Sequence, residues 1–83
     1  MPGVRDKTII SAFSQVLREA RTKRGYSQEQ LAYEAGVDRT FISMLETGKR
    51  QPTLSVIFAL AVALNQRPEE IIAATQKLSQ LPR

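Results

Sequence analysis

Residues 27–46 of this 83-residue chain, SQEQLAYEAGVDRTFISMLE, carry start and stop signals for two short helices joined by a tight turn. Ser27 stands at the first start with Gln30 three residues later, a spacing at which each side chain satisfies a main-chain amide of the new helix. Gly36 can take the left-handed conformation that ends a helix at low cost. Asp38 is a good N-cap for a second helix directly after it, where its carboxylate would accept the first amides. The sequence therefore predicts a helix, a turn and a second helix.

The second of these helices has a polar and an apolar side. At about 100° per residue, one sector takes the side chains of Arg39, Thr40, Ser43, Met44 and Thr47, and the opposite sector takes those of Phe41, Ile42 and Leu45. Only the apolar sector needs a core to cover it. The polar sector opens with an arginine at the helix start, where the helix dipole also favours a nearby phosphate. Two helices with a glycine-containing turn and such an exposed face are typical of a helix-turn-helix DNA reader.

Composition excludes several kinds of site. The chain has no cysteine and no histidine, so disulfides, zinc-finger ligand sets, thiol nucleophiles and Ser-His-Asp triads are absent. We expect no metal, no cofactor and no enzymatic activity. The absence of cysteine suits the cytoplasm. The N-terminal residues contain no long apolar run that would indicate a signal peptide, and the apolar run of residues 54–64 is far too short for a membrane span of about 20 residues.

The formal net charge of +4 favours an anionic partner such as nucleic acid. The charge alone is equally typical of an ordinary solvated surface. The two-helix stretch is itself net negative, with Glu29, Glu34, Asp38 and Glu46 against the single cation Arg39. The motif, and not the charge, therefore carries the argument for DNA.

The flanking segments predict three further helices. Residues 1–7 lack helical periodicity and are predicted to form a flexible arm, whose basic residues either follow a phosphate backbone or are only solvated. Residues 8–23 have an apolar stripe at helical spacing, and the basic residues of the last two turns suit the negative end of the helix dipole. Residues 54–64 form an uncharged run, and another helix opens at residue 68. The prediction is an all-α, five-helix domain over residues 8–81.

The stretch SQEQLAYEAGVDRTFISMLETGKRQP resembles the lambda-repressor-like (Cro/CI, or XRE) helix-turn-helix family, with S-Q-x-x-L-A, A-G-V, I-S-x-x-E and G-x-R-x-P in order. The resemblance implies a compact DNA-binding domain with the helix-turn-helix at its second and third helices. The residues assigned to base reading are Arg39, Thr40, Ser43 and Met44. Those assigned to phosphate are Gln28, Thr47, Lys49 and Arg50. Arg21 and Glu46 are implied to form a structural pair. Phe41 and Met44 depart from the tyrosine and the polar reader frequent in similar sequences, which argues against hydrogen bonds to DNA from these positions.

The uncharged run of residues 54–64 is more apolar than one small core can cover. We therefore expect a homodimer through the last two helices, with Val62, Ile72 and Leu78 as interface candidates. Such a dimer would bind double-stranded DNA at a palindromic operator. As a transcriptional regulator, the chain would be a restriction-modification controller, a phage-like repressor or an antitoxin-like autoregulator. The alternative is a helical protein-interaction module that uses the same apolar surface.

Overall fold

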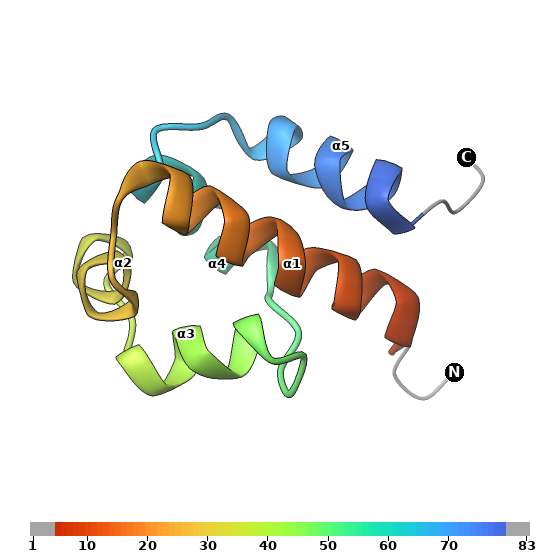
Figure 1. The fold of residues 1–83 in the computed structure, drawn as a ribbon, viewed down its shortest axis with the longest axis horizontal. Coiled ribbons are helices and arrows are strands. Elements are labelled where there is room, and N and C mark those ends of the chain that lie inside the picture. The colour runs from red at the N-terminus through yellow and green to blue at the C-terminus, as the bar shows by residue number, and fades with distance from the viewer. Residues whose placement is uncertain (1–4, 80–83) are drawn as a thin grey trace.

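The computed structural model describes residues 5–79, which form helices and connecting loops only. The helices are α1 (Lys7–Arg24), α2 (Gln28–Ala35), α3 (Arg39–Glu46), α4 (Leu54–Ala63) and α5 (Pro68–Ser79). The prediction of an all-α, five-helix domain is confirmed. Figure 1 shows α5 beside α1 and running in the opposite direction, with α3 along the other side of α1.

Helix α1 begins one residue before the predicted start because Asp6 caps it. The Asp6 carboxylate accepts the amides of Thr8 and Ile9 at 2.8 and 3.0 Å. The predicted arm of residues 1–7 therefore differs from the structure at residues 5–7, which belong to the folded domain. The rest of that arm, and the predicted domain end at residue 81, lie outside the described residues.

The helix-turn-helix unit has the boundaries that its sequence signals predict. The Ser27 hydroxyl accepts the amide of Gln30 at 3.0 Å, and the Gln30 side chain accepts the amide of Ser27 at 2.9 Å. Gly36 ends α2 with a φ of 74°, in the left-handed region that favours glycine.

The predicted cap of α3 is wrong. Asp38 holds the N-cap position in extended conformation, but its side chain accepts no amide of the first turn. Ser27 and Thr53 are exposed like Asp38 and still cap their helices, so exposure does not account for the missing bond. Its main-chain oxygen still accepts the amides of Phe41 and Ile42 and starts the helix.

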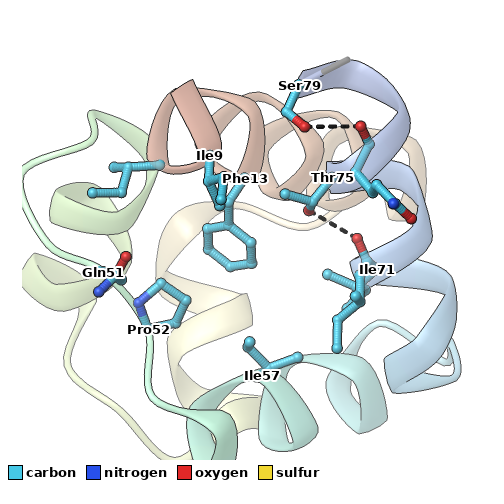
Figure 2. Close-up of a pocket in the computed structure, with 11 residues that line it drawn as sticks. Ile9, Phe13, Gln51, Pro52, Ile57, Ile71, Thr75 and Ser79 are labelled. Atoms are coloured by element: carbon cyan, nitrogen blue, oxygen red, sulfur yellow. Dashed lines mark hydrogen bonds between the residues drawn. The ribbon is translucent and has the colours of Figure 1, made fainter. Parts of the chain in front are cut away.

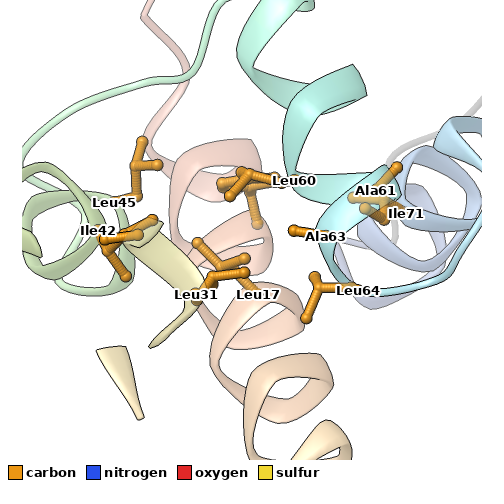
Figure 3. Close-up of a cluster of buried hydrophobic side chains, with 11 residues drawn as sticks. Leu17, Leu31, Ile42, Leu45, Leu60, Ala61, Ala63, Leu64 and Ile71 are labelled. Atoms are coloured by element: carbon orange, nitrogen blue, oxygen red, sulfur yellow. The ribbon is translucent and has the colours of Figure 1, made fainter. Parts of the chain in front are cut away.

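All five helices supply side chains to one core (Figure 3). The most deeply buried of these are Leu17, Leu31, Ile42, Leu45, Leu60 and Ile71. Each side chain of this kind contributes about 1.5–3 kcal/mol when it is buried. Because Ile42 and Leu45 both enter this core, they determine which side of α3 remains at the surface.

Candidate nucleic-acid interface

The surface of α3 opposite Ile42 and Leu45 is accessible. It carries the four residues predicted to read bases: Arg39, Thr40, Ser43 and Met44. The first two are exposed and the other two are partly exposed, whereas Phe41 is half-buried against the core. A helix that offers one polar face while its other face is anchored has the form needed to enter a DNA groove.

Arg39 is connected to the interior of the unit through Gln28, the first residue of α2. Its Nη1 donates to the Gln28 Oε1 at 3.4 Å, and the Gln28 Nε2 donates to the Glu46 Oε1 at 3.0 Å. The two ends of α3 are thus joined through one side chain of α2. The side-chain amide of Gln28, predicted to contact phosphate, is engaged inside the protein. Its main-chain amide lies in the first turn of α2, where no intrahelical acceptor exists.

Arg21 and Glu46 form a two-pronged ion pair between α1 and α3. The Arg21 Nε and Nη2 donate to the Glu46 Oε2 and Oε1 at 2.6 and 3.0 Å, and Nη1 donates to the main-chain oxygen of Tyr26 at 2.8 Å. The side chains are only 16% and 3% exposed. The hydrogen bonds to Glu46 raise the pKa of Arg21 above its ordinary value, so this guanidinium stays charged throughout the neutral range. The pair fixes the end of α3 to the long helix.

The loop after α3 presents two unengaged cations. Lys49 and Arg50 are exposed, and neither side chain has a polar partner within residues 5–79. Their main-chain amides both donate to the Met44 oxygen, at 2.9 and 3.3 Å, which folds the loop back onto α3. Thr47 differs, because its hydroxyl donates to the Ser43 oxygen at 2.9 Å. A phosphate contact from this hydroxyl would have to replace that bond.

Three side chains from the α1 side of the domain bind main-chain oxygens at the end of α3, and sequence analysis did not identify them. Ser14 Oγ donates to the Leu45 oxygen at 2.7 Å. Arg18 Nη1 donates to the Glu46 oxygen at 3.0 Å. Arg5 Nη2 donates to the main-chain oxygens of Gly48 and Lys49 in the loop, at 3.1 and 3.2 Å.

The spacing of Ser14, Arg18 and Arg21 was a signal for this contact. Residues four and then three apart lie on one side of a helix. From its position, Arg18 is interpreted as a complement to the dipole of its own helix, whereas the family resemblance pairs Arg21 with Glu46. In the structure Arg18 donates instead to the main-chain oxygen of Glu46 at the carbonyl end of α3, and Arg21 binds the Glu46 carboxylate.

Residues 5–79 contain neither a metal-binding cluster nor a membrane-spanning helix. No cluster of three or more acidic side chains there is arranged to hold a metal ion. None of the described helices is both long and apolar enough to cross a membrane.

Comparison with known proteins gives one consistent family. Residues 17–71 match the model of the helix-turn-helix family. The control protein C.BamHI of Bacillus amyloliquefaciens is 38% identical over 64 residues, which cover 76% of this chain and 79% of that protein.

Solved structures agree with this assignment. The restriction-modification controller protein C.AhdI of Aeromonas hydrophila has a TM-score of 0.73 and 44% identity, covering 75% of this chain and 94% of that one. The controller protein C.Esp1396I, solved as a tetramer in complex with its natural 35-base-pair operator, has a TM-score of 0.79 and 27% identity over 88% of this chain and 96% of that one.

The same family is indicated by three observations: the sequence motif, the exposed polar side of α3 and the family match over residues 17–71. The chain therefore belongs to the XRE-type helix-turn-helix family of sequence-specific, DNA-binding transcriptional regulators.

Proposed function

We propose that this regulator acts as a homodimer on a palindromic operator, and that its subtype is a restriction-modification controller. The observation that carries the DNA-reading part of the proposal is the accessible side of α3, with Arg39 at its start and two free cations directly after its end. The controller subtype is supported by the relatives and the solved structures, several of which are controller proteins. Such a protein acts by binding rather than catalysis, in the cytoplasm.

The side chains divide into two roles. Arg39 donates two parallel hydrogen bonds to a guanine edge, Thr40 and Ser43 contact neighbouring bases, and Met44 packs against a thymine methyl group. Lys49 and Arg50 bind phosphates, which set the register of the helix on the duplex without reading sequence. Gln28 and Thr47 flank the reading helix and are also assigned to phosphate. Gln28 does so through its main-chain amide, because its side chain holds Arg39 and Glu46.

A second copy of this chain is the proposed occupant of the apolar surface of α4 and α5. Leu60 and Ala61 of α4 are buried in the core, but Phe58 and Val62 are 52% and 79% exposed. On α5, Ile72 and Leu78 are 48% and 41% exposed. The predicted interface candidates Val62, Ile72 and Leu78 are thus all accessible, and Phe58 and Leu54 join them. Exposed apolar side chains gathered on two adjacent helices are typical of a protein interface.

A hollow of about 400 Å³ beside α5 extends this apolar surface. Figure 2 shows Ile9 and Phe13 from α1, Ile57 from α4 and Ile71 from α5 around it, together with Pro52. Ile9 and Ile72 are both half-exposed and line it. An apolar side chain of a partner subunit would fill this space.

Selection of bound duplexes from a random pool tests the proposed function. We expect an inverted repeat whose half-sites are centred about one DNA turn apart, roughly 34–36 Å, each containing a guanine read by Arg39. Enriched sites without inverted symmetry would contradict the dimeric mode. No enrichment over the starting pool would contradict sequence-specific binding itself.

A further inference from the structure

The end of α3 and the loop after it carry main-chain oxygens close in sequence to the cations proposed to bind phosphate. The carbonyl end of a helix carries negative partial charge, which repels a phosphate. Two guanidinium groups from the α1 side meet these oxygens. Arg18 binds the oxygen of Glu46, and Arg5 binds those of Gly48 and Lys49 through a single nitrogen, at 3.1 and 3.2 Å.

The loop lies directly against α1 at this point. A Cβ atom added to Gly48 would stand 3.6 Å from the Ser14 hydroxyl and 3.7 Å from a methyl group of Ile10. Gly48 has a φ of 76°, so its conformation is one that other residues rarely adopt. The bonds from Arg5 add to the main-chain bond from the Gly48 amide to the Leu45 oxygen, at 3.4 Å, in holding this residue.

We infer that Arg5 is a positioning residue for DNA binding, which acts through the loop and not by touching DNA itself. It neutralises the two loop oxygens and holds Gly48 and Lys49 so that the side chains of Lys49 and Arg50 meet the phosphate backbone. This inference rests on the proposed phosphate role of the loop. Lys7 provides a matched control, because it lines the same polar hollow as Arg5 but has no polar partner within residues 5–79.

The first test is made without DNA. In Arg5→Gln the main-chain carbonyl carbon resonances of Gly48 and Lys49 are expected to shift, while those of α2 remain in place. Lys7→Gln should leave the same two resonances unchanged. Resonances that do not move in Arg5→Gln overturn the contact and the inference with it.

The second test is a double-mutant cycle on the duplex that the wild-type protein enriches from the random pool. Arg5→Gln is expected to weaken binding about three- to tenfold, and most of this loss should vanish when Lys49 is already alanine. Arg5→Lys should recover part of the affinity, because it keeps a positive charge at the position that faces the two oxygens. Denaturation midpoints of the variants show that each remains folded.

An additive cycle overturns the inference. If the cycle is additive and Arg5→Gln also flattens the slope of log affinity against log salt by about one phosphate contact, Arg5 binds phosphate itself. If the wild-type protein enriches no duplex, the proposed function itself fails. This outcome differs from an additive cycle, which contradicts only the inference about Arg5.

Discussion

Arg39 is the side chain on which base recognition depends most. It is exposed at the start of α3, and Gln28 holds its guanidinium. We expect Arg39→Ala to lose about 1–3 kcal/mol of specific binding and to relax the preference at one base position per half-site.

Arg39→Lys is the control, because it keeps the charge and removes the planar fork that pairs with guanine. Repeating the duplex selection with each variant measures the preference. Equal loss of affinity on selected and random duplexes would show that Arg39 contacts phosphate only.

Glu46 is charged and yet only 3% exposed, because Arg21 and Gln28 both donate to its carboxylate. Removing one partner of a buried ion pair leaves the other charge without compensation, at a cost on the order of 3–5 kcal/mol. We expect Glu46→Ala to lower the free energy of unfolding by about that amount, measured in urea. Glu34→Ala, an exposed site on α2, should change it by less than about 1 kcal/mol. Equal denaturation midpoints for both variants would show that the pair contributes nothing to stability.

The loop after α3 is expected to bind DNA without regard to sequence. Lys49 is exposed and its side chain is unengaged within the described part of the chain. Lys49→Ala should therefore weaken binding to all duplexes about equally, and should flatten the slope of log affinity against log salt by roughly one phosphate's worth.

Lys77→Ala, on the exposed surface of α5, is the matched charge deletion. Helix α5 lies on the other side of α1 from α3 (Figure 1). A slope that changes equally in both variants would mean that only net charge matters.

Helix ends were predictable where a local signal determines them. The Ser27 and Gln30 pair and the glycine at residue 36 act within a few residues of themselves, so their sequence spacing is enough. Asp6 is the same kind of local signal, because its side chain caps α1. It was missed because residues 1–7 lack helical periodicity and were predicted as an arm. Asp38 shows the converse, since a residue suited to capping stands at the N-cap of α3 and makes no side-chain cap bond.

Contacts between helices were predictable only in part. Local patterns indicated which side of α3 is buried, because Ile42 and Leu45 are apolar and adjacent on that face. The contact of Arg21 with Glu46 was reached through resemblance to a family and not from spacing. The bonds from Arg5 and Arg18 to the end of α3 join residues 28 to 44 positions apart. Their partners are main-chain oxygens, which every residue has, so the sequence does not indicate which oxygen each arginine binds.

The whole domain places its two working surfaces on different helices. Helix α3 carries the DNA-reading side, and α4 and α5 carry the apolar surface proposed for the second subunit. One recognition helix offers only a few side chains to bases, and each wrong base pair costs typically about 1–3 kcal/mol. Two subunits joined through α4 and α5 would add their discrimination. The proposed dimer would therefore explain both the unusual apolar content of α4 and the sequence specificity expected of α3.

Val62→Glu tests this arrangement, because Val62 is 79% exposed and the substitution leaves the monomer core intact. In a two-fold interface the substitution introduces a buried charge from each subunit, and like charges brought together cost several kcal/mol. We expect the dimer dissociation constant to rise at least about tenfold by sedimentation, and affinity for the selected inverted repeat to fall with it. Tyr33→Glu makes a comparable change at an exposed position of α2 and should leave dimerisation unchanged. A wild-type protein that remains monomeric at high micromolar concentration would contradict the proposed dimer.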